Sequence, residues 1–520
     1  MPKITIDSKP VEVEQGSTIL DAAEKLGIEI PTLCFLKSCK PLTSCMVCLV
    51  RVDGADKFVP ACAAVAQDGM RVESDSQDIF AARRTALELL LSDHLGDCVG
   101  PCHEICPAKM NIPKMIREIA AGEFQNAVKT IKERIALPAV LGRICPAPCE
   151  KGCRRAYYDS PVAICLLKRY AADTDLFSGN PFIPECKKST GRNVAIVGAG
   201  PAGLAAAYYL LQYGHTCTLF DEHLQAGGML RYAVSQERLP RDILDAEIGI
   251  IQKLGAQFEL KSRIDAAAFE QLRKNFDAVI IAAGPSRTNQ IEKFGVPATA
   301  DGIVVDKNSL QTKVENIFAA GDVIRARKLA VRAAAEGRTA AVSVTQLLTD
   351  KPVKGPLKQF NTRIGAPKPE EVEQFMAAIS RQERTQVSAE SPEGLKSDQA
   401  GTEALRCMRC DCAKAEVCRL RYWADRYDAH PRKFADQRQR YIQHRQHPDI
   451  LYEPGKCIKC GLCIQITENA AEQLGLTFVA RGFDVKVAVP FGASIAQGLQ
   501  KTAAKCAEAC PTAALAFKRY

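Results

Sequence analysis

Long apolar runs, aromatic residues and low-complexity segments are scarce in this chain of 520 residues. No stretch of 18 or more residues is uniformly apolar, so we expect no membrane span. Aromatic residues make up 6% of the chain, with one Trp, which argues against the base-stacking surfaces of nucleic-acid-binding proteins. With 47% hydrophobic and 25% charged residues, the composition also excludes an intrinsically disordered class and indicates several globular domains.

Cysteine, by contrast, is abundant: the chain has 23, many of them clustered and several followed by Pro. Residues 1–6 begin with strand-like alternation rather than an apolar leader, so we expect no signal peptide and a cytoplasmic location. In a reducing compartment, clustered thiols are typical of metal or iron–sulfur sites. Because a cluster with four thiolates carries roughly −2, such sites offset much of the net charge of +9, and we predict no nucleic-acid partner.

The first domain is expected over residues 1–75. Residues 3–6 and 11–14 alternate around a turn and predict a hairpin, and a helix is expected to follow Ser17 or Thr18. Four thiols come next with the spacing C-x10-C-x2-C-x13-C, at Cys34, Cys45, Cys48 and Cys62. A long loop that supplies three sulfurs suits a cluster of two irons, although a zinc site or unrelated thiols are the alternatives.

This cysteine spacing resembles the N-terminal ferredoxin domain of the large soluble subunit of respiratory complex I and of iron-only hydrogenases. The resemblance implies a β-grasp-like fold with a 2Fe–2S cluster on those four cysteines. The sequence departs from the family in having Thr43 and Ser44 where Gly often precedes the C-x2-C pair, and Cys39 is an additional thiol.

A helical domain with two cysteine groups is expected over residues 76–185. Residues 81–93 and 112–134 have helical periodicity, and the cysteines lie after each of these stretches. The segments NIPKMIREIAAGEFQNAVKTIKE and LGRICPAPCEKGC resemble the N-terminal helical domain of the glutamate synthase small subunit and of dihydropyrimidine dehydrogenase. In that family the domain holds two 4Fe–4S clusters, with ligands interleaved between the two cysteine groups.

Carried over by position, the resemblance implies one cluster on Cys106, Cys145 and Cys149, with Cys165 as its fourth ligand. The second cluster is expected on Cys98, Cys102 and Cys153, and the family's leading cysteine is missing here. We predict His94 in its place, because the complex I and hydrogenase proteins carry a His-x3-Cys ligand pair after their ferredoxin. The alternative is a histidine that interacts with the dipole at a helix C-terminus.

A nucleotide-binding domain is expected over residues 190–355. A buried strand at 193–197 leads into a glycine-rich turn and a helix, and the next strand ends at an acid; the residues concerned are Gly198, Gly200, Gly203 and Asp221. The dinucleotide fingerprint requires this strand–turn–helix–strand context, with the pyrophosphate at the helix N-terminus and the acid at the ribose.

Later segments favour FAD over NAD, which is the alternative for this site. They contain Gly227, Gly228, Arg231, Gly284, Gly321 and Asp322. These segments resemble the FAD-binding half of the glutamate synthase small subunit and its pyridine-nucleotide disulfide reductase relatives, where the Asp holds the ribityl or pyrophosphate region. That family inserts a second Rossmann domain, for NAD(P)H, between the last two glycine turns. Here the two turns lie too close in sequence for several βαβ units of about 30 residues each, so we predict no NAD(P)H domain.

Residues 356–450 are expected to be a polar linker with one helix near 370–379, followed by a further cysteine motif. The motif has the spacing C-x2-C-x-C-x5-C, at Cys407, Cys410, Cys412 and Cys418, and both a 4Fe–4S cluster and a zinc ion are compatible with it. Over residues 451–520, the bacterial ferredoxin pattern predicts one 4Fe–4S cluster on Cys457, Cys460, Cys463 and Cys510. The second cluster of those ferredoxins has lost a ligand here, so Cys506 is not expected to bind iron.

Together these interpretations predict a multidomain α/β and α+β protein: a β-grasp-like ferredoxin, a helical double-cluster domain, a Rossmann-type FAD domain and a bacterial-ferredoxin-like domain. It would carry FAD, one 2Fe–2S cluster and three 4Fe–4S clusters, with a further cluster or zinc at residues 407–418. We expect an electron-transferring subunit whose partners are redox subunits of the hydrogenase, formate dehydrogenase or NAD(P)H-oxidising flavoprotein type. The alternatives are a self-contained NAD(P)H oxidoreductase and a scaffold with structural clusters. No catalytic side-chain constellation is evident.

Overall fold

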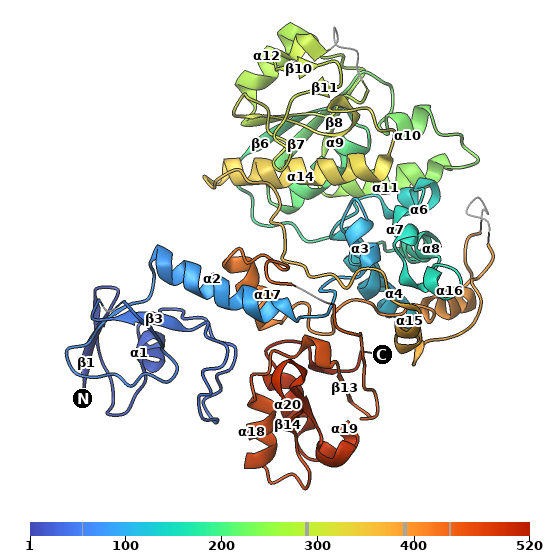
Figure 1. Cartoon of the computed structure of the whole chain (residues 1–520). Coiled ribbons are helices and arrows are strands. Elements are labelled where there is room, and N and C mark those ends of the chain that lie inside the picture. The colour runs from blue at the N-terminus through green and yellow to red at the C-terminus, as the bar shows by residue number, and fades with distance from the viewer. Residues whose placement is uncertain (55, 286–290, 388–392, 436–437, 520) are drawn as a thin grey trace. The chain divides into compact units, whose positions relative to one another are not determined.

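The computed structural model describes residues 1–520 except 55, 286–290, 388–392, 436–437 and 520 (Figure 1). It divides into two compact units, each built from separate stretches of the chain. Unit 1 comprises Met1–Val99, Gln359–Ala377 and Cys410–Tyr520, and unit 2 comprises Gly100–Lys358 and Ala378–Arg409. In the sequence, unit 2 is therefore inserted between the two main segments of unit 1. The segment Gln359–Ala377, which interrupts unit 2, also belongs to unit 1.

Unit 1 begins with a five-stranded sheet in the order β2-β1-β5-β3-β4, in which β1 and β5 are parallel. Thr18 caps the only α-helix of this part through a capping box with Asp21, as the expected helix start near Ser17 or Thr18 requires. The elements are β1 (Lys3–Ile6), β2 (Lys9–Glu12), α1 (Ile19–Lys25), β3 (Leu49–Val52), β4 (Phe58–Pro60) and β5 (Arg71–Glu73). The mixed sheet with a helix packed against it agrees with the β-grasp-like fold expected for residues 1–75.

The rest of unit 1 consists of helices and two small antiparallel sheets, β13–β16 and β14–β15. Strands β13 and β16 bring the last residues of the chain back beside the start of the C-terminal cysteine motif. The elements are α2 (Gln77–Ser92), α15 (Pro369–Met376), α17 (Arg419–Arg426), β13 (Ile450–Tyr452), α18 (Leu462–Asn469), β14 (Thr477–Val479), β15 (Lys486–Ala488), α19 (Ile495–Gly498), α20 (Ala503–Ala509) and β16 (Leu515–Phe517).

Unit 2 begins with short helices that have Pro in their first turn. Proline suits this position because its fixed φ is helical and it lacks the N–H that would be unpaired there. Helices α4 and α5 bury one strongly apolar face each, and α6 packs against α8. These elements are α3 (Pro101–Ile105), α4 (Ile112–Ala120), α5 (Phe124–Lys132), α6 (Pro138–Ile144), α7 (Pro148–Lys151) and α8 (Ile164–Leu176).

A parallel five-stranded sheet in the order β12-β9-β6-β7-β8 forms the second half of unit 2. Its central strands are buried along their whole length, as a sheet covered on both faces requires. The elements are β6 (Asn193–Val197), α9 (Pro201–Gln212), β7 (Thr216–Asp221), α10 (Met229–Tyr232), α11 (Arg241–Lys253), β8 (Gln257–Leu260), α12 (Ala266–Asn275), β9 (Ala278–Ile281), β10 (Ala298–Thr299), β11 (Gly302–Ile303), β12 (Ile317–Ala319) and α14 (Ala330–Leu348). This is the Rossmann-type arrangement that the sequence predicts.

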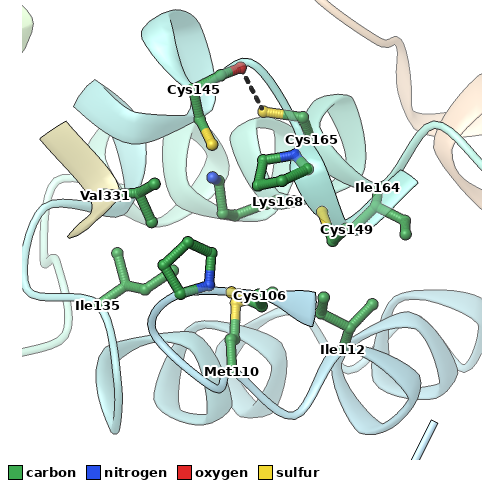
Figure 2. Close-up of a pocket in the computed structure, with 12 residues that line it drawn as sticks. Cys106, Met110, Ile112, Ile135, Cys145, Cys149, Ile164, Cys165, Lys168 and Val331 are labelled. Carbon is green, nitrogen blue, oxygen red and sulfur yellow. Dashed lines mark hydrogen bonds between the residues drawn. The ribbon is translucent and has the colours of Figure 1, made fainter. Parts of the chain in front are cut away.

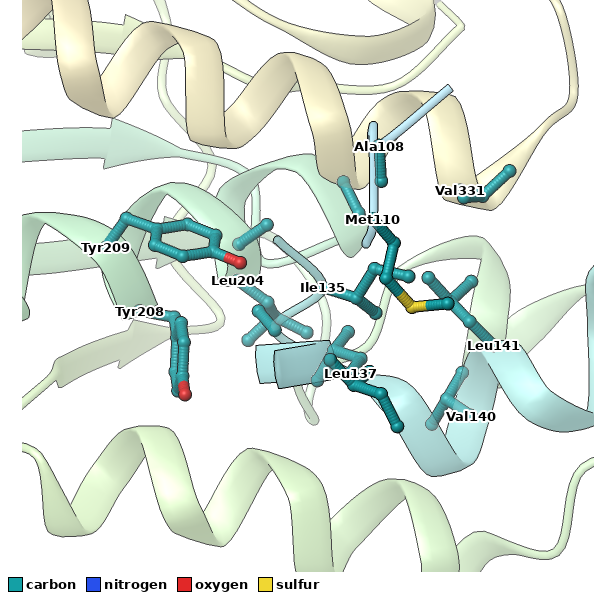
Figure 3. Close-up of a cluster of buried hydrophobic side chains, with 14 of the residues drawn as sticks. Ala108, Met110, Ile135, Leu137, Val140, Leu141, Leu204, Tyr208, Tyr209 and Val331 are labelled. Carbon is teal, nitrogen blue, oxygen red and sulfur yellow. The ribbon is translucent and has the colours of Figure 1, made fainter. Parts of the chain in front are cut away.

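One continuous hydrophobic core joins the helical half of unit 2 to its nucleotide-binding half (Figure 3). Ile135 and Leu137 from the helical half lie near Leu204 of α9, and Val331 of α14 belongs to the same core. The two halves therefore fold as one body rather than as separate domains.

The segment expected to be a linker is in part ordered and buried. Helix α16 (Ser397–Ala404) packs on α4 and α8, and the side chains of Glu403 and Arg406 are fully buried as an ion pair with Nη1–Oε1 2.8 Å. The carboxylate of Glu403 also accepts the backbone N–H of Ala163 at 2.8 Å. Polar composition suggested a linker because buried, paired charges are indistinguishable in sequence from solvated ones. Among the described residues, no helix combines the length and apolarity that crossing a bilayer requires.

Candidate iron–sulfur and nucleotide sites

The four N-terminal cysteines form two buried pairs. The Sγ atoms of Cys34 and Cys45 are 3.2 Å apart, and those of Cys48 and Cys62 are 3.4 Å apart. Within each pair the hydrogen bond between the thiols lowers the pKa of one member, to about 6 for Cys34 and about 7 for Cys48, and raises that of the other. Two sulfur pairs with readily ionised members fit a centre of two irons, each of which takes two thiolates.

Four cysteines of the helical half of unit 2 line one pocket with an empty volume of about 330 Å³ (Figure 2). They are the set expected for one 4Fe–4S cluster: Cys106, Cys145, Cys149 and Cys165. Two prolines next to ligand cysteines line this pocket: Pro107, which follows Cys106, and Pro148, which precedes Cys149. The hydrogen bond with Cys165 lowers the pKa of Cys145 to about 6, which favours the thiolate form that iron requires.

Lys168 points into the same pocket and is buried (Figure 2). Its ammonium group donates to the carbonyl oxygen of Leu141 at 3.0 Å. Burial alone lowers the pKa of Lys168, but the surrounding thiolates, Cys165 foremost, raise it above the ordinary value. The lysine therefore stays charged, and a cation at this place offsets the negative charge of a thiolate-bound cluster. The sequence analysis missed Lys168, which stands three residues after Cys165 with no motif of its own.

The C-terminal cysteines line a second pocket, with an empty volume of about 380 Å³. Its sulfurs are the four predicted from the ferredoxin pattern, Cys457, Cys460, Cys463 and Cys510. Cys506 is buried beside this pocket but does not line it, and its Sγ lies 3.8 Å from the carbonyl oxygen of Cys463. The observed lining thus agrees with the sequence-based ligand set.

The turns at Cys407 and Cys457 have the same backbone conformation. In both C-x2-C segments the residue before the second cysteine is left-handed, with φ 51° at Arg409 and 55° at Lys459. Such turns point successive N–H groups at one place, as anionic sulfur clusters require. Among the described residues, no three His, Cys, Asp or Glu side chains gather around a single point as they do in a mononuclear metal site. The cluster or zinc expected at residues 407–418 stays a prediction.

The remaining predicted ligands are divided between the two units. Unit 1 contains His94, Cys98, Cys410, Cys412 and Cys418, whereas unit 2 contains Cys102, Cys153 and Cys407. In unit 2, α3 packs on α7. The residues just before Cys102 and Cys153 are therefore close, since a Cβ at Gly152 would lie 3.3 Å from the carbonyl oxygen of Pro101. The sequence-based grouping of Cys98 with Cys102 and Cys153 stays a prediction.

The glycine-rich turn after β6 is packed as a dinucleotide-binding turn must be. Gly198 has φ 110°, and a Cβ there would lie 2.4 Å from the carbonyl oxygen of Ala282. A Cβ at Gly203 would lie 1.9 Å from the carbonyl oxygen of Gly198, so only glycine lets helix α9 approach the strand. At Gly200, the residue that begins α9, the nearest atom to a Cβ would be Gly228 Cα at 3.9 Å, which leaves the helix N-terminus open to a phosphate.

Asp221 ends β7, and its carboxylate already has protein partners. One oxygen accepts the N–H of Ala199 in the glycine turn at 2.7 Å, and the other accepts the N–H of His223 at 2.9 Å. His223 Nδ1 lies 2.7 Å from that same oxygen, Oδ1, so the carboxylate holds both the glycine turn and the residues after β7, and its contact with a ribose stays a prediction.

The second glycine pair faces the first. A Cβ at Gly228 would lie 2.8 Å from Gly200 Cα, and Gly227 donates its N–H to the carbonyl oxygen of Ala199 at 2.9 Å. Arg231 donates to the carbonyl oxygen of Ala226 at 2.7 Å and pairs with Asp245. In this structure Arg231 therefore stabilises the loop around the two glycines, and a direct role in cofactor binding stays a prediction.

The Gly-Asp turn after β12 lies against the start of α9. Gly321 has φ 81°, and a Cβ there would lie 3.0 Å from the Cβ of Ala202. Asp322 accepts the backbone N–H groups of Arg327 at 3.3 Å and Lys328 at 3.1 Å. Gly284 has φ 74° with open space around its Cα. Between Gly284 and Gly321 the described residues form short 3-10 turns and the antiparallel β10–β11 pair, with no parallel βαβ unit among them.

Comparison with known protein families assigns most of these regions. Residues 2–77 match the 2Fe-2S iron-sulfur cluster binding domain, and residues 95–179 match dihydropyrimidine dehydrogenase domain II, 4Fe-4S cluster. Residues 196–259 match the NAD(P)-binding Rossmann-like domain, and residues 246–337 match pyridine nucleotide-disulphide oxidoreductase. These matches confirm the 2Fe–2S domain, the 4Fe–4S domain and the nucleotide-binding oxidoreductase domain predicted from the sequence.

Curated relatives match over part of the chain. NADP(+)-dependent formate dehydrogenase subunit beta of Moorella thermoacetica is 39% identical over 206 residues, 35% of this chain and 29% of the relative. NADPH-Fe(3+) oxidoreductase subunit beta of Geobacter sulfurreducens is 39% identical over 193 residues, 36% of this chain and 28% of the relative. NAD-dependent dihydropyrimidine dehydrogenase subunit PreT of Escherichia coli is 37% identical over 197 residues, 37% of this chain and 48% of the relative.

The chain thus matches less than half the length of each of these relatives, all of which are subunits by name. Within this chain, matches to a 2Fe–2S domain, to a 4Fe–4S domain of the dihydropyrimidine dehydrogenase type and to pyridine nucleotide-disulphide oxidoreductase follow one another, so the chain combines iron–sulfur domains with an oxidoreductase domain.

Proposed function

We propose that this chain is an electron-transferring iron–sulfur flavoprotein subunit, in which unit 2 carries FAD. One observation supports this most directly: Val331, at the start of α14, lines the pocket formed by the four sulfurs of unit 2. Helix α14 also packs along α9, the helix of the glycine-rich turn. A cluster in that pocket and a dinucleotide on that turn would share one rigid core, which suits transfer of electrons between them.

FAD exchanges electrons singly or in pairs, whereas each cluster exchanges one, so the combination converts between the two kinds of chemistry. The residues of this chain would bind and position the cofactor. The N-terminus of α9 stabilises the pyrophosphate, and Gly200 and Gly228 leave the space that it needs. Gly321 brings the Asp322 turn against α9, where the family places the ribityl or pyrophosphate region.

Unit 1 supplies the further relay. Two cysteines of its 2Fe–2S domain, Cys34 and Cys45, share one buried hydrophobic cluster with Cys460 of the C-terminal ferredoxin pattern. Arg419 connects the two sites: it donates to the carbonyl oxygen of Thr32 at 2.7 Å, and its backbone N–H binds the carbonyl oxygen of Pro511 at 3.0 Å. Burial lowers the pKa of Arg419, while the thiolates of Cys45, Cys34 and Cys460 act in the opposite direction.

We infer that partner subunits donate electrons to this relay or accept electrons from it. Relatives named as subunits of formate dehydrogenase, of an NADPH-Fe(3+) oxidoreductase and of a dihydropyrimidine dehydrogenase support redox partners of these types. The segment between the two glycine turns contains the short β10–β11 pair, whereas an NAD(P)H-binding domain needs several βαβ units. This supports a hydride donor that binds to a partner subunit.

Anaerobic titration of the purified chain, reconstituted with FAD and iron, tests the proposal. We expect neither NADPH nor NADH to bleach the flavin of the isolated chain, and dithionite to reduce flavin and clusters reversibly. A partner that co-purifies from the native host is expected to restore reduction by its own substrate. Flavin bleached by NADPH or NADH alone would instead identify a self-contained oxidoreductase, and clusters that resist reversible reduction would identify a scaffold.

A further inference from the structure

Cys412 of the 407–418 motif lies beside Cys98, which precedes unit 2 in the sequence. The backbone N–H of Cys412 donates to the carbonyl oxygen of Cys98 at 3.3 Å, although all of unit 2 separates them in sequence. Both side chains are buried, with exposed fractions of 7% and 8%. Cys418, the next cysteine in the motif, begins helix α17 and accepts the N–H of Arg421 at Sγ, at 3.4 Å.

The Cys98 and Cys418 sulfurs both have polar neighbours. Thr362 donates its backbone N–H to Cys98 Sγ at 3.5 Å, and its hydroxyl oxygen lies 3.4 Å from the same sulfur, contacts of the kind that tune cluster sulfurs. Cys418 Sγ lies 3.8 Å from the carbonyl oxygen of Pro511. Cys98, Cys412 and Cys418 are thus three candidate sulfur ligands within unit 1.

His94 supplies a fourth donor. Its Nδ1 is buried and has no hydrogen-bond partner among the described residues. A Cβ at Gly96 would lie 3.4 Å from His94 Nε2, so the ring lies against the loop that leads to Cys98. A buried imidazole nitrogen without a hydrogen-bond partner is available to a metal.

A buried cation stands beside this set. A Cβ at Gly96 would lie 2.8 Å from Lys456 Cε, so the lysine passes directly over the His94–Cys98 loop. Lys456 Nζ pairs with the carboxylate of Glu453 at 2.5 Å, and both side chains are buried. The loop between His94 and Cys98 is thus covered by a buried ion pair.

We propose that unit 1 holds a 4Fe–4S cluster with two pairs of ligands. One pair, His94 and Cys98, precedes unit 2 in the sequence, and the other pair, Cys412 and Cys418, follows it. This grouping replaces the one expected from sequence and divides the 407–418 motif between two sites. Cys407 is left to unit 2 with Cys102 and Cys153. Arg155, two residues after Cys153, donates to the carbonyl oxygen of Arg406 at 3.1 Å, which supports that second set.

The two groupings predict different losses when single cysteines are replaced in the full chain. We expect Cys98→Ser and Cys412→Ser to remove the same reduced 4Fe–4S signal in electron paramagnetic resonance, together with about four irons per chain, and Cys102→Ser to remove a different signal. Cys506→Ser is the matched control and keeps all signals, because Cys506 lies outside every proposed ligand set. If Cys98→Ser and Cys102→Ser remove one common signal while Cys412→Ser removes another, the proposal is wrong.

Replacement of the histidine tests the fourth ligand separately. Pulsed resonance of the wild-type chain is expected to show nitrogen coupling from imidazole on one reduced 4Fe–4S centre. His94→Cys keeps four ligands and the full iron content, and it should abolish only that coupling. His444→Ala, a half-buried histidine of the same unit that stacks on Tyr452, should leave the coupling unchanged. Nitrogen coupling that persists in His94→Cys would overturn the assignment.

Discussion

At the scale of the residue, Gly203 shows how little room the nucleotide site leaves. A Cβ on this residue would lie 1.9 Å from the carbonyl oxygen of Gly198, so Gly203→Ala must push α9 away from β6. We expect this variant to lose about 1–3 kcal/mol of unfolding free energy through overpacking and to retain less than about a tenth of the wild-type flavin. Flavin-to-protein ratio after reconstitution, with thermal unfolding, measures both effects.

Gly249 is the matched control for this prediction, because it also lies inside a helix, α11, but has open space where a Cβ would be. Gly249→Ala should bind flavin normally and gain about 0.5–1 kcal/mol from helix propensity. Equal flavin content in the two variants would show that the glycine turn does not hold the cofactor.

At the scale of the element, the N-terminus of α6 depends on one buried acid. Glu247 of α11 accepts the backbone N–H groups of Ala139 and Val140, both at 2.9 Å, and α6 leads directly to Cys145. Burial raises the pKa of Glu247 to about 7 from 4.5, despite these hydrogen bonds. The folded chain therefore binds more protons than the unfolded chain between these values, and its stability falls as pH rises through that window.

We expect this fall to amount to about 3 kcal/mol or less between pH 4.5 and 7, because each pKa unit corresponds to about 1.4 kcal/mol. Thermal unfolding of the reconstituted chain between about pH 5.5 and 8 measures the slope. Glu247→Gln should flatten it, whereas the exposed Glu237→Gln should leave it unchanged. An unaltered slope in Glu247→Gln would mean that another group is responsible.

Elements were predictable from the sequence where the signal is local. Thr18, the Cys-Pro turns and the strand–glycine–helix run at 193–212 each fix their own backbone, and the structure has them as expected. The burial of α16 was not predictable, because Glu403 and Arg406 meet partners far away in the chain. The pockets follow the same rule: Cys457, Cys460 and Cys463 are close in sequence and line one pocket, whereas the contact between Cys98 and Cys412 is visible only in three dimensions. The ligand sets themselves stay predictions.

At the scale of the whole molecule, the insertion of unit 2 explains why the cysteine motifs looked incomplete. The chain leaves unit 1 after Val99 and returns for good at Cys410, so residues that are neighbours within unit 1 can be separated in sequence by all of unit 2. With the proposed ligand sets, unit 1 contains a relay of its own. Neighbouring sites within unit 1 should therefore sense one another's charge and spin.

The 2Fe–2S loop offers a direct test, because it packs on the C-terminal ferredoxin pattern. Lys40 and Gln465 exchange two hydrogen bonds, at 2.8 and 3.1 Å, and a Cβ at Gly461 would lie 2.4 Å from Leu42 Cδ1. We expect the resonance of the reduced 2Fe–2S centre to be broadened and to relax fast whenever the C-terminal cluster is also reduced. Cys463→Ser should remove that cluster and leave a narrow, slowly relaxing 2Fe–2S signal, whereas replacement of the exposed Cys186 by Ser should change nothing. A 2Fe–2S signal that is the same with and without the C-terminal cluster would place the two centres too far apart to form one relay.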